Sequence, residues 1–153
     1  MKEFYELICK NNINQIIISG GIKDSIEKTL LIINNEIKLD DVGVISNEFI
    51  YDNNKIIDYK KPLIYTFNKS KIFENNRNKK ELENKSILFL GDHINDIDIL
   101  SNIKYLEKLT ISFDNNIINP KSNKTHLEKY DCIIGNDGDF LHINTILKYI
   151  LKK

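Results

Sequence analysis

The sequence is poor in several residue types, and each scarcity narrows what the protein can be. Its two cysteines, Cys9 and Cys132, lie outside any CxxC spacing, which argues against a disulfide framework or a zinc site and favours a reducing, cytoplasmic compartment. Arg77 is the single arginine, and 22 basic residues balance 22 acidic ones, so no net field draws the chain to nucleic acid or a membrane. No apolar run approaches the roughly 18 residues that span a bilayer, and the N-terminus lacks the build of a signal peptide. We expect a soluble protein with neither nucleic-acid nor membrane partners.

Short apolar runs alternate with helical periodicities along the chain. The pattern predicts strands at 15–19, 42–46, 87–90, 109–113 and 131–135, and a hairpin over 49–59 that turns at Asn53-Asn54. It predicts helices near 4–12, 22–33, 71–82, 94–103, 119–130 and 140–150. Such alternation is typical of an α/β fold with a mostly parallel sheet and helices on both faces. At 153 residues, we expect a single domain over 1–153.

The most informative stretch is the acidic turn that follows the strand 87–90. The strand has the character of one buried on both faces; it ends at Gly91, and the next residues include Asp92 and Asp96. Carboxylates at the carboxyl end of a parallel strand lie where α/β sheets bind ligands, and their oxygens suit Mg²⁺. The alternative reading is that Asp92 or Asn95 only caps the following helix.

A second turn, Ser19-Gly20-Gly21, follows the strand 15–19. Its hydroxyl and amides would meet the N-terminus of the next helix, which makes an anion site, although most Gly-Gly turns only reverse the chain. Further along, Lys69 ends a short extended stretch. Together, a hydroxyl, an ammonium group and two carboxylates provide the parts with which phosphoryl-transfer sites stabilise negative charge.

These motifs resemble the cytosolic pyrimidine 5′-nucleotidase family of the haloacid dehalogenase (HAD) superfamily. Residues 17–24, IISGGIKD, are similar to the family's S-A-G-I-x-D motif, and 63–69, LIYTFNK, look like its L-I-H-T-F-N-K run, with Tyr65 in place of histidine. Residues 90–96, LGDHIND, resemble L-G-D-S-x-G-D, with His93 and Asn95 departing from serine and glycine. Ser46-Asn47 and the strand 130–134 also match family motifs, so the resemblance covers nearly the whole chain.

The resemblance implies a Rossmann-like HAD core and a Mg²⁺-dependent hydrolysis of nucleoside 5′-monophosphates, typically UMP or CMP, through an aspartyl-phosphate. Carried over by residue, Ser19, Gly20 and Gly21 would bind the phosphoryl group, and Lys69 would neutralise its developing charge. Asp92 and Asp96 would be the Mg²⁺ ligands, with Asp96 in direct contact or one shell out. His93 is more readily a residue of the site's rim than a ligand, because Mg²⁺ prefers oxygen.

The family's nucleophile and its base-recognising cap have no counterpart here. The nucleophile belongs to a D-x-D motif on a strand that precedes the serine motif, whereas the D-x-D sequences of this chain, at 96–98 and 137–139, are misplaced for that role. In the superfamily that strand lies between the strands ending at Ser19 and Asp92, so its loss would leave open sheet edges. We therefore expect an incomplete core, a C-terminal part of a longer protein, inactive by itself.

Two other functions stay open at this stage. A catalytically dead relative could keep the phosphate pocket, or could complete its sheet with another chain through an open edge. A generic Rossmann-like dinucleotide-binding module is the weaker alternative, because no G-x-G-x-x-G follows any predicted strand.

Overall fold

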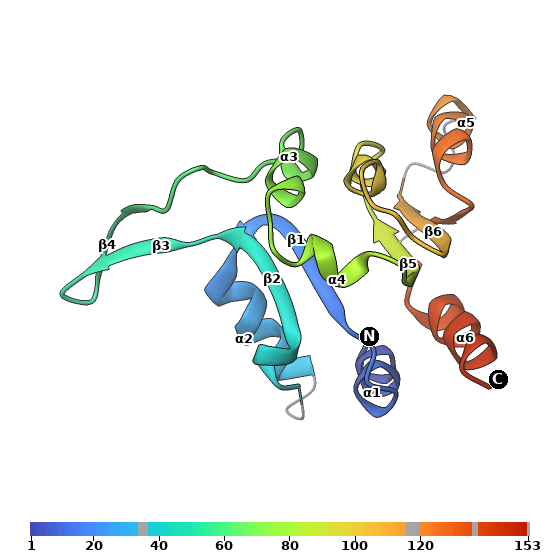
Figure 1. The fold of residues 1–153 in the computed structure, drawn as a ribbon, viewed down its shortest axis with the longest axis horizontal. Helices are drawn as coiled ribbons and strands as arrows, with labels where there is room; N and C mark the ends of the chain where they lie inside the picture. The colour runs from blue at the N-terminus through green and yellow to red at the C-terminus, as the bar shows by residue number, and fades with distance from the viewer. Residues whose placement is uncertain (34–36, 116–119, 136–137, 153) are drawn as a thin grey trace. The chain divides into compact units, whose positions relative to one another are not determined.

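The computed structural model describes residues 1–33, 37–115, 120–135 and 138–152 (Figure 1). The chain divides into two compact units, the first formed by Met1–Ile64 with Asp139–Lys153 and the second by Tyr65–Gly138. The expectation of a single domain over 1–153 stays a prediction.

The first unit is built on two parallel strands, β1 (Gln15–Ile22) and β2 (Val42–Asn47). The strands, rich in β-branched residues, pair in register from Gln15 opposite Val42 to Ile18 opposite Ile45. The helix α2 (Lys23–Ile33) follows β1 directly and packs against both strands, as Figure 1 shows. A short 3₁₀ helix, η1 (Leu39–Asp41), leads into β2. The predicted strand–helix–strand order is confirmed.

The two glycines after Ser19 do not form the expected turn. Strand β1 continues through Gly20 and Gly21 to Ile22, with a register irregularity between Ile18 and Ile22. Glycine in a strand often marks such an irregularity, because it lacks a side chain to hold the regular pleat. The helix therefore begins at Lys23, later than the sequence pattern predicts.

Two helices from the ends of the chain complete this unit. The helix α1 (Lys2–Lys10) lies beside α6 (Leu141–Ile150), and the rings of Phe4 and Phe140 meet edge to face at 5.0 Å between centroids. Ile143 is fully buried in α6, and Glu3 accepts hydrogen bonds from Asn144 and Lys148. Both helices were predicted from their apolar periodicity.

The predicted hairpin is also present in the first unit. Strands β3 (Phe49–Asp52) and β4 (Lys55–Tyr59) pair antiparallel around Asn53 and Asn54, whose φ angles are 46° and 62°. Asparagine tolerates the positive φ that two-residue hairpin turns need, which is why the turn could be predicted. Every residue of β4 is exposed, and Figure 1 shows the hairpin extending away from β2.

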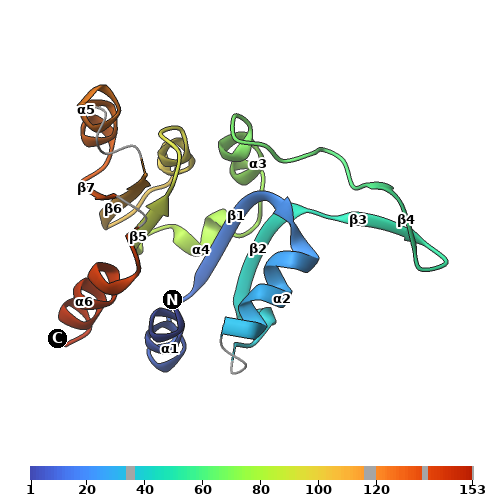
Figure 2. The same ribbon diagram turned by 180° about the vertical axis from the view of Figure 1, so that it is seen from behind.

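The second unit contains a three-stranded parallel sheet in the order β5-β6-β7, seen from behind in Figure 2. Its strands are β5 (Ser86–Gly91), β6 (Glu107–Asp114) and β7 (Cys132–Gly135). The central strand β6 is the most buried, with Ile111 and Ser112 fully inaccessible to solvent. The helix α5 (Pro120–Lys129) connects β6 to β7 as predicted.

Two predicted helices of the second unit are shorter than expected. In place of one helix over 71–82 there are two, α3 (Lys69–Glu74) and α4 (Lys79–Leu82), separated by the polar residues 75–78. In place of a helix over 94–103 there is a 3₁₀ helix, η2 (Asp96–Leu100). Apolar residues at every third position fit the three-residue turn of a 3₁₀ helix, so the spacing was correct and the helix type was wrong.

Strands β1 and β5 are less buried than predicted. Ile16 to Ser19 and Ile87 to Leu90 are only half-buried. Among the described strands, β1 pairs with β2 alone and β5 pairs with β6 alone. Within its own unit, and among the strands that the structure describes, each is therefore hydrogen-bonded to a strand on one side only.

The parallel strands and covering helices confirm the predicted α/β fold class. Within the described ranges, no helix combines the length and the apolar character needed to traverse a bilayer.

Candidate active site

The end of β5 is built around a glycine that lets three chain segments approach each other. A Cβ atom on Gly91 would lie 2.7 Å from the Tyr130 hydroxyl oxygen and 3.2 Å from Cβ of Asp96. The Tyr130 hydroxyl in turn donates to the carbonyl of His93 at 2.9 Å. Only glycine leaves the space for this packing, and it brings the chain to Asp92 at the carboxyl end of the strand.

Lys69 and Asp96 form the central contact of the site. The Lys69 Nζ atom donates to Asp96 Oδ1 at 2.8 Å, and the two side chains are only 13% and 6% exposed. Lys69 is the first residue of α3, and Asp96 is the first residue of η2, so the packing of these two elements joins the pair. The sequence analysis placed both residues in one site, and the structure brings them together.

The second oxygen of Asp96 is weakly held. The backbone N–H of His93 donates to Asp96 Oδ2 at 3.3 Å, at the long end of hydrogen-bond distances. Asp92 is exposed on the preceding turn. One carboxylate is therefore fixed by an ammonium group, while the other faces solvent and is free to turn toward a ligand.

His93 has a structural role on this turn. Its Nδ1 atom accepts a hydrogen bond from the backbone N–H of Asn95 at 3.1 Å. Its ring packs edge to face against the ring of Phe67, with 6.1 Å between the ring centroids. The accepting Nδ1 defines the tautomer with hydrogen on Nε2. This arrangement agrees with the expectation that His93 is a rim residue, which remains a prediction.

Tyr130 supports the turn from β7's side of the sheet. It is 3% exposed, and burial together with the negative charge of Asp96 raises the pKa of its phenol well above the ordinary value. The hydroxyl thus stays a donor to His93 at neutral pH. Sequence analysis identified Tyr130 only as part of a family motif and did not assign this contact.

The serine motif belongs to the first unit. Ser19 is half-buried, and its Oγ accepts the N–H of Gly21 at 3.0 Å, so this amide is held by the serine itself. Gly20 and Gly21 are exposed. The carbonyl of Gly20 accepts a hydrogen bond from Asn47 Nδ2 at 2.8 Å. The convergence of Ser19 with Lys69 and Asp92 stays a prediction.

The oxygen ligands at the end of β5 fit Mg²⁺. Among the described residues, no cluster of three or more His, Cys, Asp or Glu side chains could hold a metal ion. Asp92 and Asp96 alone supply two carboxylates, which is the number of protein ligands Mg²⁺ commonly takes while water and substrate phosphate fill the remaining positions. The donor set is therefore compatible with this ion, provided that Asp96 gives up or shares its contact with Lys69.

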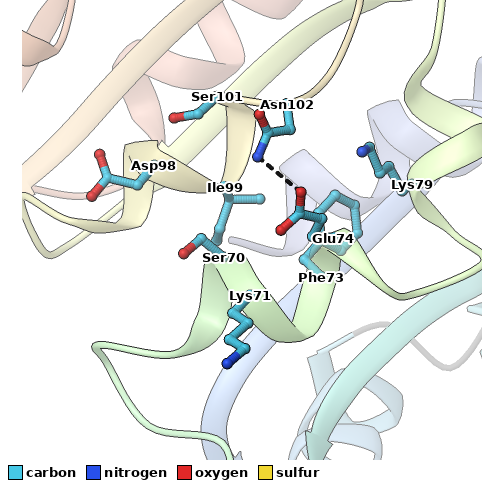
Figure 3. A pocket seen from close by; sticks show the side chains of 9 residues that line it. All are labelled: Ser70, Lys71, Phe73, Glu74, Lys79, Asp98, Ile99, Ser101 and Asn102. Atoms are coloured by element: carbon cyan, nitrogen blue, oxygen red, sulfur yellow. Dashed lines mark hydrogen bonds between the residues drawn. The ribbon is translucent and has the colours of Figure 1, made fainter.

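A cavity of about 410 Å³ lies beside these residues in the second unit, between α3 and η2. Figure 3 shows its lining, in which Asn102 Nδ2 donates to Glu74 Oε1 at 3.1 Å. None of the predicted site residues lines this cavity. It therefore gives no support to the candidate site and is not part of it.

The chain is thus an α/β protein in which a lysine pairs with a buried aspartate, next to a second aspartate at the carboxyl end of a parallel strand. The carboxyl ends of parallel strands are where α/β proteins commonly bind ligands. The sequence profile of the pyrimidine 5′-nucleotidase (UMPH-1) family matches residues 1–151. The chain belongs to this family, which confirms the resemblance seen in its motifs.

Several characterised proteins are similar to the chain. The 7-methylguanosine phosphate-specific 5′-nucleotidases of Mus musculus and Gallus gallus are each 28% identical to it, over 98% and 97% of the chain and 50% and 52% of their own lengths. The human protein of the same name is 27% identical over 98% of the chain and 50% of its own length. The chain thus spans about half the length of these relatives.

A solved structure has the same fold. The crystal structure of cytosolic 5′-nucleotidase IIIB bound to cytidine superposes with a TM-score of 0.80, over 99% of this chain and 51% of that one, at 22% identity. This likeness supports the predicted HAD-like core.

Proposed function

We propose that residues 1–153 contain the phosphate-binding and Mg²⁺-binding part of a 5′-nucleotidase that hydrolyses nucleoside 5′-monophosphates. The observation that carries the proposal is the Lys69–Asp96 pair beside Asp92 at the end of β5. Membership of the pyrimidine 5′-nucleotidase family supports it. Lys69 and Asp96 also lie in the segments 63–69 and 90–96, which resemble that family's motifs.

Each residue has a defined chemical role in this proposal. The hydroxyl of Ser19 and the backbone of Gly20 and Gly21 bind phosphoryl oxygens, and the ammonium group of Lys69 compensates the charge that develops on them. Asp92 and Asp96 hold Mg²⁺, which when bound supplies positive charge to the phosphoryl group. The reaction breaks the bond between phosphorus and the 5′ oxygen. The oxygen of a water molecule ends up bonded to phosphorus in the released phosphate, and a proton from that water ends up on the 5′ oxygen of the released nucleoside.

The nucleophile is not assigned to a residue of this chain. In the D-x-D sequence at 96–98, Asp96 is engaged by Lys69, and Asp98 is exposed and pairs with Lys129 at 3.5 Å. Neither carboxylate lies at the end of a strand. We therefore propose that residues 1–153 alone bind a nucleoside monophosphate without turning it over.

The proposed substrates are UMP and CMP, as the family's description suggests. The relatives named for 7-methylguanosine phosphate make its 5′-monophosphate a third compound to compare. The proposed compartment is the cytoplasm, in which the free and exposed thiols of Cys9 and Cys132 would stay reduced.

Isothermal titration calorimetry of the 153-residue chain tests the proposal. We expect Mg²⁺-dependent binding of at least one of the three nucleotides, and at least about a tenfold weaker affinity in Asp92→Asn, because the exposed carboxylate would lose one charged ligand oxygen. Glu83→Gln, another exposed acid of the second unit, is the matched control and should bind as the wild type does. Equal affinity with and without Mg²⁺, or no binding, would contradict the proposal, and phosphate release by the chain would contradict its inactivity.

A second candidate is a chain that completes its sheet with another polypeptide. The open side of β5 favours it, since an unpaired parallel strand presents backbone N–H and C=O groups to a partner strand. Light scattering after size exclusion distinguishes the candidates: a stable oligomer that shows no nucleotide binding would favour this second function, and a monomer that binds nucleotide would favour the first.

A further inference from the structure

The side chain of Asn47 makes three hydrogen bonds to the backbone, although it was not assigned to the predicted site. It is the last residue of β2 and is only 8% exposed. Its Nδ2 atom donates to the carbonyls of Gly20 at 2.8 Å and Ile64 at 2.9 Å, and its Oδ1 atom accepts the N–H of Ile64 at 2.8 Å.

These three hydrogen bonds use one amide to connect two separate backbone segments. Gly20 is 27 positions before Asn47, and Ile64 is 17 positions after it. The contact with Ile64 has the two-point geometry of a strand pair, in which one residue both donates to and accepts from its neighbour. Only an asparagine or glutamine side chain carries a donor and an acceptor in this arrangement.

The segment that Asn47 holds is the irregular part of β1. Regular pairing between β1 and β2 ends at Ile18 opposite Ile45 and resumes at Ile22 opposite Asn47. Gly20 lies between these pairs, is exposed, and has no side chain that would restrict its backbone conformation. The hydrogen bond from Asn47 therefore holds the part of β1 in which regular pairing with β2 is interrupted.

We propose that Asn47 is a positioning residue for phosphate binding: its side chain fixes the Gly20 backbone, and with it the orientation of Ser19 and the amides that follow. This inference rests on the proposed function, because it assigns Asn47 a task within that site. Asn47 does not touch the phosphoryl group. It acts by removing alternative backbone conformations, which would otherwise have to be lost when the anion binds.

The alternative is that Asn47 only stabilises the fold, and Asn144 provides the control for it. Asn144 is 4% exposed in α6 of the same unit and donates from Nδ2 to Glu3 at 2.7 Å. Asn47→Ala and Asn144→Ala both remove a buried, hydrogen-bonded amide, so both should lower the melting temperature. Only the first removes a contact to Gly20.

The experiment measures two quantities in the full 153-residue chain and both variants. The first is the dissociation constant for inorganic phosphate, from calorimetry in Mg²⁺ buffer. The second is the amide hydrogen-exchange rate of Gly20 and Gly21, from NMR of a chain with six glycines. We expect Asn47→Ala to weaken phosphate binding and to speed exchange at these glycines, each by about tenfold. Asn144→Ala should leave both within about twofold, whatever its melting temperature.

The outcomes separate this inference from the proposed function. If the wild-type chain binds no phosphate, both the proposed function and the assignment of Asn47 to phosphate binding are contradicted. Faster amide exchange at Gly20 and Gly21 in Asn47→Ala would even then show that the Asn47 side chain fixes the strand. If the wild type binds and Asn47→Ala binds equally well, or if Asn144→Ala weakens binding as much, the inference is wrong and the proposed function stands. Asn47→Gln, which keeps both polar atoms on a longer stem, should recover part of the lost affinity.

Discussion

Replacing Lys69 by methionine tests the central contact of the candidate site. The change keeps the length and apolar stem of the side chain but removes the ammonium group, which leaves the Asp96 carboxylate 6% exposed with one long hydrogen bond, from the His93 N–H at 3.3 Å. Removing one partner of a buried ion pair commonly costs about 3–5 kcal/mol. We expect Lys69→Met to lower the free energy of unfolding by about 3 kcal/mol, the lower end, because Asp96 retains that hydrogen bond. At roughly 2–4 °C per kcal/mol, the melting temperature should fall by about 6–12 °C.

The assay is urea denaturation followed by far-UV circular dichroism, with Lys129→Met as the matched control. Lys129 pairs with Asp98 at 3.5 Å in the same unit, but these side chains are 39% and 49% exposed, so its loss should cost less than about 1 kcal/mol. Adding Asp96→Asn to Lys69→Met should recover about half or more of the loss, because the unpaired charge is gone. Equal losses for the two lysine variants, or no recovery in the double variant, would refute the reasoning.

Three further perturbations test other parts of the second unit. Gly91→Ala should lower the free energy of unfolding, measured by urea denaturation, by about 1–3 kcal/mol, because the new Cβ would lie 2.7 Å from the Tyr130 hydroxyl oxygen. Adding Tyr130→Phe should recover part of that loss, and a double variant whose losses simply add would contradict the predicted clash. Hydrogen bonds from the hydroxyl and the backbone N–H of Thr110 lower the pKa of Asp131. These bonds therefore stabilise the fold fully at pH values above the ordinary pKa of 3.8, and this stabilisation is lost as the pH falls through the lowered pKa. The stability gap between wild type and Asp131→Asn, measured by denaturation across pH, should therefore be full at pH 6 and close on acidification. Phe73→Ala should cost about 3–5 kcal/mol because the ring is fully buried, while Phe67→Ala, at a ring that is 75% exposed, should change stability by no more than about 0.5 kcal/mol.

The elements that could be predicted from the sequence are those with strong local determinants. The hairpin turn at Asn53 and Asn54 could be predicted because asparagine tolerates positive φ. The strand at Ile87 to Leu90 could be predicted from its short, continuous apolar run. The burial of that strand could not be predicted in the same way. It depends on a neighbouring strand, and the described strands place one on a single side of β5.

The motifs mark candidate site residues, but they do not predict which side chains contact each other. The motifs assigned Lys69 and Asp96 to one predicted site, and the structure shows that the two side chains form an ion pair, which the motifs did not predict. The proposed role of Asn47 has no local signal beyond an asparagine at the end of a strand. The serine motif shows the opposite error. Two consecutive glycines predicted a turn, whereas cross-strand pairing with β2 resumes at Ile22 and extends the strand through them.

Under the proposed function, the Lys69–Asp96 pair explains how the site remains stable before its ligands bind. A largely buried ammonium group and a buried carboxylate are each costly alone, and at 2.8 Å, with side chains 13% and 6% exposed, they satisfy each other. A phosphate ester offers the ammonium group a second anion, and a divalent cation offers the carboxylate a second positive charge. Either ligand alone competes with the existing contact, whereas both together replace it without leaving a buried charge unpaired. Under the proposed function, the cation and the phosphate ester should therefore each raise the affinity for the other, since such coupling is reciprocal.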